Sequence, residues 1–144
     1  MRVLFDTNVL LDALLAREPF VADAAFLMES VESGRVEGFI SATTITDVHY
    51  LVRRQTKSAE IAMTAVIQLM ALMEVCAVDR EVLEQALRFV KVGTALKLAD
   101  FEDAVQVACA VVVGIEAITT RDEAGFAGSP IQVLSPKALR ERLL

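Results

Sequence analysis

The sequence is poor in the residues that build zinc sites, disulfide frameworks and thiol chemistry. It has one histidine, two cysteines and no tryptophan in 144 residues. Cys76 and Cys109 stand among apolar neighbours, and neither has a second cysteine or a histidine at a metal-binding spacing. A zinc site is therefore disfavoured, and we expect both cysteines to be reduced core residues of a cytoplasmic protein.

Long apolar stretches are also missing from the sequence. None reaches the roughly 18 residues that a membrane-spanning helix needs, and an acid, Asp6, follows a first apolar run of only three residues. Neither a membrane segment nor a secretory signal is predicted, so we expect a soluble protein without a membrane partner. The hydrophobic fraction is nonetheless 55%. We therefore expect one domain, residues 1–144, in which some elements are buried on both faces.

Basic residues are fewer than acidic ones, 14 against 20, which gives a formal charge of −6. This is the wrong sign for a protein that attracts nucleic acid through its overall field. Any contact with nucleic acid is therefore expected to be local. Acids that gather around divalent cations would be partly neutralised, so the charge counted without metal overstates the repulsion.

Strands and helices are predicted to alternate along the chain. Short apolar runs predict strands, and apolar residues at three- and four-residue spacing predict helices, while residues 91–99 form the least structured stretch. The methionines of the 59–73 helix are predicted to be core residues. This order favours a three-layer α/β/α fold with a central parallel sheet of about five strands. The expected strands are residues 3–5, 39–40, 75–78, 117–119 and 131–134, and the expected helices include 21–33, 43–54, 59–73, 80–90 and 103–113.

Four acids lie where strands of such a sheet end or where a helix begins. Asp6 and Asp122 follow the first and fourth predicted strands. Asp47 lies in the helix after the second strand, and Asp103 lies near the start of the helix after residues 91–99. Functional residues of open parallel sheets gather beyond the carboxyl ends of the strands. Carboxylates that converge there repel one another unless a cation neutralises them, and oxygen ligands favour Mg²⁺ or Mn²⁺.

Most of these acids also have a purely structural interpretation. The helix dipole stabilises acids in a first turn, which can account for Asp47 and Asp103. Asp100 can cap its helix and pair with Asp103 instead of binding a ligand. Only Asp6, which ends an apolar strand, has little local structural reason to be acidic. Spacing alone therefore leaves a metal site as one of two interpretations.

Four segments in order resemble the four motifs of a PIN domain. They are VLFDTNVLLD (residues 3–12), ISATTITDVHY (40–50), DFEDAVQ (100–106) and ITTRD (118–122), followed by the closing IQVLSP (131–136). The sequence is most similar to small bacterial PIN proteins of the VapC toxin type. The resemblance implies a five-stranded parallel sheet between helices and a ribonuclease that depends on Mg²⁺ or Mn²⁺.

The resemblance also implies roles for individual residues. Asp6 and Asp103 become the principal metal ligands, and Asp122 becomes a second ligand or a group that orients water. Asp47 completes the acidic site as an outer contributor, because many family members have the longer glutamate at that position. Asn8, Thr120 and Asp100 are expected to support the site.

The partners implied by the resemblance are an RNA substrate, an antitoxin and a second copy of the chain in a homodimer. The chain is then the toxin of a type II toxin-antitoxin pair, and the antitoxin is expected to place a basic side chain near the acids. Two alternatives within the family are a module that binds RNA or protein without turnover and a housekeeping RNA-processing nuclease. A third is a phosphatase of the haloacid dehalogenase type, which needs a second aspartate where this chain has Asn8.

Overall fold

The computed structural model of the protein describes residues 1–90 and 100–144. Its centre is a five-stranded sheet in which all neighbouring strands are parallel. The spatial order is β3-β2-β1-β4-β5, so β1 is central and Asp6 follows it at the carboxyl edge of the sheet. The predicted α/β fold with about five parallel strands is confirmed. The strands are β1 (Arg2–Phe5), β2 (Glu37–Ser41), β3 (Glu74–Cys76), β4 (Ala117–Thr119) and β5 (Gln132–Leu134).

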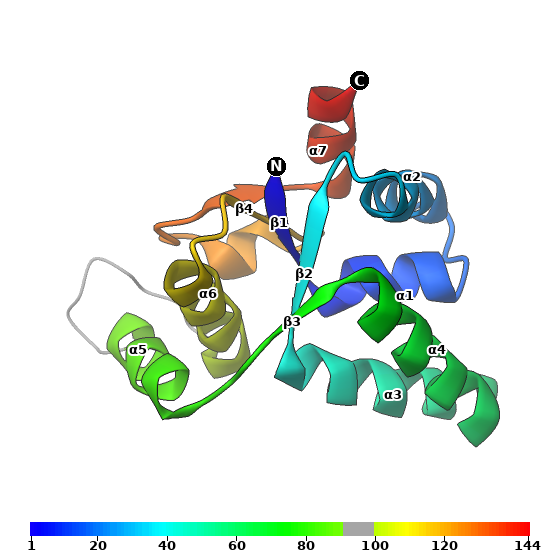
Figure 1. The fold of residues 1–144 in the computed structure, drawn as a ribbon, viewed down its shortest axis with the longest axis horizontal. Helices are drawn as coiled ribbons and strands as arrows, with labels where there is room; N and C mark the ends of the chain where they lie inside the picture. Colours follow the sequence, from blue (N-terminus) through cyan, green and yellow to red (C-terminus); the bar gives the residue numbers. More distant parts are fainter. Residues whose placement is uncertain (91–99) are drawn as a thin grey trace.

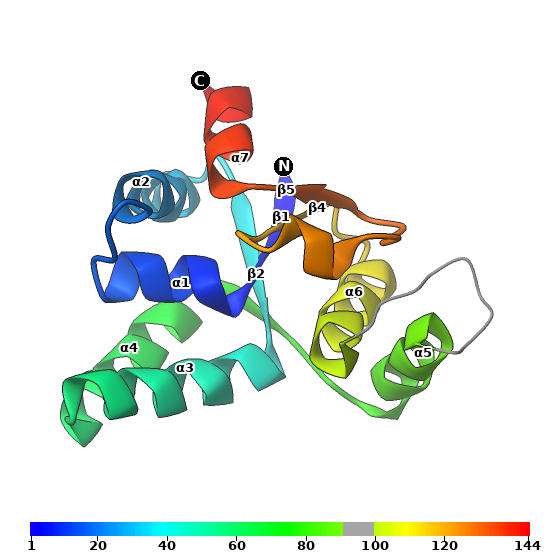
Figure 2. The same cartoon turned by 180° about the vertical axis from the view of Figure 1, so that it is seen from behind.

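Helices cover both faces of the sheet (Figures 1 and 2). Figure 1 shows α5 and α6 on one side of the sheet and α1, α3 and α4 on the other. The side chains of β1 alternate accordingly: Val3 and Phe5 pack with α1 to α4 and α7, whereas Leu4 packs with α5 and α6. The helices are α1 (Thr7–Leu14), α2 (Val21–Glu32), α3 (Ala42–Thr56), α4 (Ala59–Leu72), α5 (Arg80–Val90), α6 (Phe101–Val113) and α7 (Pro136–Leu143), with a short 3-10 helix η1 (Glu123–Phe126).

Capping residues determine where the helices at the carboxyl edge begin. Ser41 ends β2 and caps α3, because its hydroxyl accepts a hydrogen bond from the Thr44 amide at 3.2 Å. Asp6 caps α1 and Asp100 caps α6 with their carboxylates. Such oxygen acceptors satisfy amides that have no partner within the helix. The positive ends of the α1 and α6 dipoles therefore lie beside acids.

Two predictions about α4 and β3 are wrong in detail. Met63 and Met70 are not core residues, since they are 50% and 56% exposed; Met73 alone of the three is buried. The buried face of α4 is formed instead by Ala62, Ala65 and Leu69, which join the core. β3 ends at Cys76 rather than at residue 78, because its partner β2 ends at Ser41, opposite Cys76.

Two further expectations concern the 91–99 segment and the membrane. The predicted lack of structure in residues 91–99 lies outside the described residues. Among the helices that are described, none combines the length and the apolar character needed to span a bilayer. The α6 helix is buried along most of its length, although Val111 and Val112 are 38% and 44% exposed.

Candidate metal site

A cavity of about 490 Å³ opens at the carboxyl edge of the sheet, beyond β1 and β4. Six acidic side chains line it, and Arg17 is the single basic side chain among its described lining residues. The acids come from separate parts of the chain, and the parallel sheet brings them together because its strands end at the same edge. They are Asp6, Asp47, Asp100, Glu102, Asp103 and Asp122.

Asp6 is held by hydrogen bonds on both oxygens and is only 7% exposed. Its Oδ1 accepts from the Thr7 amide at 2.7 Å and from the Gln106 side chain at 2.9 Å. Its Oδ2 accepts from the Thr120 hydroxyl at 2.7 Å and from the Asn8 side chain at 3.1 Å. A carboxylate offers about four lone-pair sites, so these four donors fix its orientation.

Thr120 and Asn8 connect Asp6 to the turn that carries Asp122. The Thr120 hydroxyl, which donates to Asp6, also accepts a hydrogen bond from the Asp122 amide at 3.0 Å. Asn8 donates to the same hydroxyl at 3.2 Å, and its side-chain oxygen accepts from the Arg121 amide at 3.2 Å. The end of β1, the start of α1 and the turn after β4 therefore form one hydrogen-bonded unit.

Asp100 and Asp103 have different environments at the start of α6. Asp100 is exposed, and its Oδ1 accepts a hydrogen bond from the Asp103 amide at 3.1 Å, which makes it the N-cap. Asp103 is partly buried. Burial, together with the negative charges of Asp6, Asp100 and Asp122, raises the pKa of Asp103 to about 7. Burial is the largest cause of this shift, and repulsion from the three neighbouring carboxylates adds to it.

Asp47 is paired with Glu102, an acid that the sequence prediction did not include. A hydrogen bond with Asp47, followed by burial and by the charges of Asp47, Asp100 and Asp103, raises the pKa of Glu102 to about 7. The acids of the cavity thus form two groups, one around Asp103 and one made by Asp47 and Glu102. The sequence signal for Glu102 is its place in the acid-rich DFED segment.

Gly125 leaves a space where two of the carboxylates approach each other. A β carbon on Gly125 would lie 2.5 Å from Asp122 Oδ2 and 3.1 Å from Asp103 Oδ2, so both oxygens border the place a side chain would fill. Within residues 1–90 and 100–144, no three acidic, histidine or cysteine side chains converge on one point. Mg²⁺ is commonly bound by one or two carboxylates and keeps several of its waters, so this set of oxygen donors fits such a cation.

The non-acidic residues that line the same cavity include three that the sequence prediction missed and that can contact a ligand: Arg17, Tyr50 and Gln106. Tyr50 is 63% exposed, whereas Gln106 is 2% exposed and donates to Asp6. The signal for Gln106 is a polar residue among the apolar ones that follow Asp103 in α6, three positions after Asp103 and so on the same helix face.

Other chemically active side chains lie outside the acidic cavity. His49 is not among its lining residues. Cys76 and Cys109 are free and buried, as predicted, and burial raises the pKa of their thiols to about 11 and about 12. Both cysteines are therefore protonated core residues rather than nucleophiles or metal ligands.

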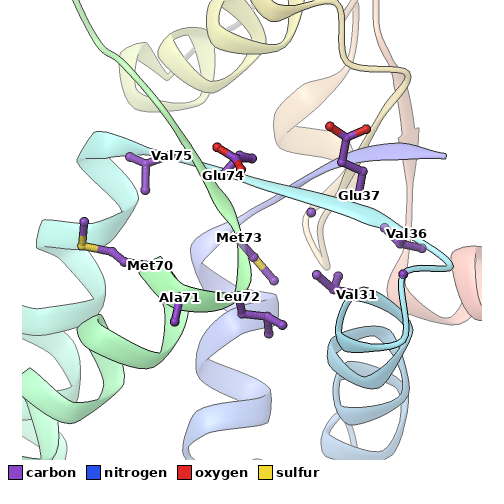
Figure 3. A pocket seen from close by; sticks show the side chains of 11 residues that line it. Val31, Val36, Glu37, Met70, Ala71, Leu72, Met73, Glu74 and Val75 are labelled. Atoms are coloured by element: carbon purple, nitrogen blue, oxygen red, sulfur yellow. The ribbon is translucent and has the colours of Figure 1, made fainter.

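A second cavity, of about 590 Å³, lies near the amino ends of β2 and β3 (Figure 3). Val31 and Met73 contribute apolar surface to it, and its acids are Glu37 and Glu74. Glu37 is paired with Arg2 at 3.4 Å. Although this cavity is the larger of the two, it holds no group of acids comparable to that at the carboxyl edge, which is therefore the candidate site.

The sequence profile of the PIN domain family matches residues 2–124. The chain belongs to the PIN domain family. This PIN domain is similar in structure to a toxin-antitoxin complex from Klebsiella pneumoniae, with 21% identity over 93% of this chain and 97% of that one and a TM-score of 0.67. No curated protein matches the sequence.

Two further solved structures share the fold of this PIN domain. One is VapC20 of Mycobacterium tuberculosis, a sarcin-ricin loop cleaving toxin, with 20% identity over 88% of this chain and 97% of that one and a TM-score of 0.68. The other is VapBC-1 from nontypeable Haemophilus influenzae, with 14% identity over 95% of this chain and 99% of that one and a TM-score of 0.67. At these identities the likeness establishes the fold.

The predicted site residues of this PIN domain lie together in space. Thr120 does not line the cavity, but it reaches the cavity through its hydrogen bond to Asp6. The other six predicted residues line it directly: Asp6, Asn8, Asp47, Asp100, Asp103 and Asp122.

Proposed function

We propose that this PIN domain is a ribonuclease that depends on Mg²⁺ or Mn²⁺ and hydrolyses RNA phosphodiester bonds. The observation that carries the proposal is the approach of Asp6, Asp103 and Asp122 at one cavity, where the charges of Asp6 and Asp122 act on Asp103. Converging carboxylates with no histidine or cysteine among the described residues that line the cavity favour a hard divalent cation.

The proposed ligands are Asp6, Asp103 and Asp122, which would reach the cation directly or through its waters because no three acids of the described residues converge on one point. Asp47 contributes from its pair with Glu102. A bound divalent cation supplies a water of lowered pKa and neutralises charge that develops on a phosphate. The chain itself supplies the orientation of the ligands. The hydroxyl that donates to Asp6 also accepts from the Asp122 amide, so these two ligands are held through one side chain.

Hydrolysis by water fits this site better than attack by a protein group. Asn8 occupies the position at which a phosphatase of the haloacid dehalogenase type needs a second acid. Within the described residues, the cysteines and His49 lie outside the cavity.

Local contacts can bind RNA to a protein whose net charge is −6. Arg17 places a guanidinium beside the acids, where it can contact a backbone phosphate. Tyr50 lines the same cavity and is 63% exposed, so its ring is available to stack on an unpaired base. These two contacts favour single-stranded or looped RNA as the substrate.

We further infer that the domain is the toxin of a toxin-antitoxin pair. Its support is the shared fold with proteins described as toxins or toxin-antitoxin complexes. The acidic cavity also suits an antitoxin arginine or lysine, which would pair with the carboxylates and keep a cation out. The expected homodimer stays a prediction, which light scattering on the purified chain tests.

Sequencing RNA ends after controlled expression tests the proposal in cells. Expression of the wild-type chain should produce RNA ends at one or a few discrete sites, and expression of Asp6→Asn at the same level should not. Co-expression of the neighbouring gene, if it encodes the antitoxin, should suppress those ends. Identical end profiles for wild type and variant would contradict the proposal.

A further inference from the structure

Gln106 is a buried polar residue, and only one of its two polar side-chain atoms has a hydrogen-bond partner in the described residues. The residue is 2% exposed and lines the acidic cavity from α6. Its Nε2 donates to Asp6 Oδ1 at 2.9 Å, whereas its Oε1 is buried and has no hydrogen-bond partner among the described residues. A buried polar atom without a partner destabilises the folded state, so its retention in a site calls for a reason.

The carboxylate of Asp6 determines how the Gln106 side-chain amide is oriented. An ionised carboxylate only accepts hydrogen bonds, so the amide nitrogen must face Asp6 and the oxygen must point elsewhere. Gln106 lies three residues after Asp103 and therefore on the same face of α6. The unpartnered oxygen is therefore buried at the wall of the cavity that Gln106 lines together with Asp103 and Asp6.

We propose that Gln106 is a further residue of the cation site, where its amide nitrogen holds Asp6 and its amide oxygen supplies a neutral oxygen to the hydrated cation. The inference rests on the proposed metal dependence of the site. A neutral oxygen adds an acceptor without adding to the repulsion that already acts on Asp103. A glutamate at this position would offer an oxygen but could not donate to Asp6.

Thr119 provides a matched comparison within the same molecule. It is fully buried, and its Oγ1 is the other buried side-chain atom without a partner in the described residues. Thr119 is opposite Phe5 in the β1–β4 register, and Phe5 packs with α1 to α4, away from α6. Thr119 is not among the residues that line the acidic cavity, and Thr119→Val therefore serves as the control.

The test is calorimetric titration of the full chain with Mn²⁺ in the absence of RNA. Gln106→Met keeps the size of the side chain but removes both the donor and the oxygen, and it should raise the Kd for Mn²⁺ about tenfold, as outer partners of metal ligands commonly do. Gln106→Glu, which restores an oxygen but not the donor to Asp6, should bind Mn²⁺ clearly more tightly than Gln106→Met. Thr119→Val should leave the Kd unchanged.

The outcomes separate this inference from a structural role and from the proposed ribonuclease activity. Equal weakening by Gln106→Met and Gln106→Glu would show that the residue only holds Asp6, and an unchanged Kd in Gln106→Met would also overturn the inference. If Gln106→Met does not fold, Gln106→Asn withdraws the amide by one methylene and should give the same tenfold loss. A wild-type chain that binds Mn²⁺ in this way but cleaves no RNA would sink the ribonuclease proposal and leave the role of Gln106 standing.

Discussion

Arg121 forms a bidentate ion pair with Asp12, a fully buried acid 109 positions away in the sequence. Arg121 Nε lies 2.6 Å from Asp12 Oδ2, and Nη2 lies 3.2 Å from Oδ1. The guanidinium also stacks on Phe20, 3.9 Å from the centre of its ring. Because Arg121 stands between Thr120 and Asp122, this pair ties the turn that carries the proposed site to α1.

Loss of the guanidinium should destabilise the whole domain. Arg121→Met leaves the Asp12 carboxylate buried without its main partner, which should lower the free energy of unfolding by about 3 kcal/mol. Urea unfolding followed by circular dichroism measures the change. Arg80→Met is the control, because the Arg80–Glu84 pair is exposed and should contribute about 0.5 kcal/mol or less. Equal losses in both variants would contradict the assigned role of the buried pair.

A side chain at position 125 should interfere with cation binding. In Gly125→Ala the new methyl would meet Asp122 Oδ2 at 2.5 Å and Asp103 Oδ2 at 3.1 Å, so at least one carboxylate must move. We expect the Kd for Mn²⁺ to rise about tenfold, measured by titration calorimetry. Ala124→Ser, an exposed change one residue earlier, should leave the Kd unaltered. A folded Gly125→Ala that binds Mn²⁺ like wild type would place the cation elsewhere.

The cation-free domain should lose stability as the pH rises from about 4 to about 7. Asp103 has a pKa raised from 3.8 to about 7 in the folded state, and Glu102 has one raised from 4.5 to about 7. Between these values the folded state binds more protons than the unfolded chain, so the free energy of unfolding falls with rising pH. The stabilisation that these two groups provide is fully present below their ordinary pKa values of 3.8 and 4.5, and it is lost as the pH rises above about 7.

Thermal unfolding in EDTA at a series of pH values measures this dependence. The Tm of wild type should decline across the window, and Asp103→Asn should show a flatter decline because it has no carboxyl group to ionise. Mn²⁺ should raise the Tm of wild type most strongly near pH 7.5, where the carboxylates are charged and the cation is bound. A Tm that rises between pH 5 and pH 7 in EDTA, in wild type and variant alike, would argue against uncompensated carboxylates.

Arg17 should contribute to RNA affinity more than other arginines do. Arg17→Ala should raise KM for a cleavable RNA several-fold and lower the salt slope of binding by about 1, as expected for one lost phosphate contact. Arg53→Ala removes an exposed charge near the end of α3, outside the cavity, and should change neither quantity. If the two variants have the same KM and the same salt slope, Arg17 does not contact the RNA.

The fold could be predicted from the sequence because its signals are local. Apolar runs and helical spacing locate the elements, and caps such as Ser41 and Asp100 sharpen their limits. The prediction failed for Met63 and Met70, since periodicity marks an apolar face but does not tell whether another element covers it. The predicted third strand was also too long, because the end of β3 depends on where its partner β2 ends.

The candidate site was only partly predictable. Asp6 was found from its place after a strand, and the other acids from ordered motifs that resemble those of a known family. Glu102 and Gln106 were missed because their importance arises from contacts with Asp47 and Asp6, which lie far away in the sequence. Contacts between residues far apart in the sequence produce no periodic pattern from which they could be predicted.

Cleavage of RNA by the purified chain tests the central claim most directly. Wild type, freed of metal and then supplied with Mn²⁺ or Mg²⁺, should cut a single-stranded RNA substrate, and EDTA should stop the reaction. Asp6→Asn, purified in parallel and shown to be folded, should have no cleavage above background with either cation. Cleavage by Asp6→Asn at the wild-type rate, or wild-type cleavage that persists in EDTA, would contradict the account.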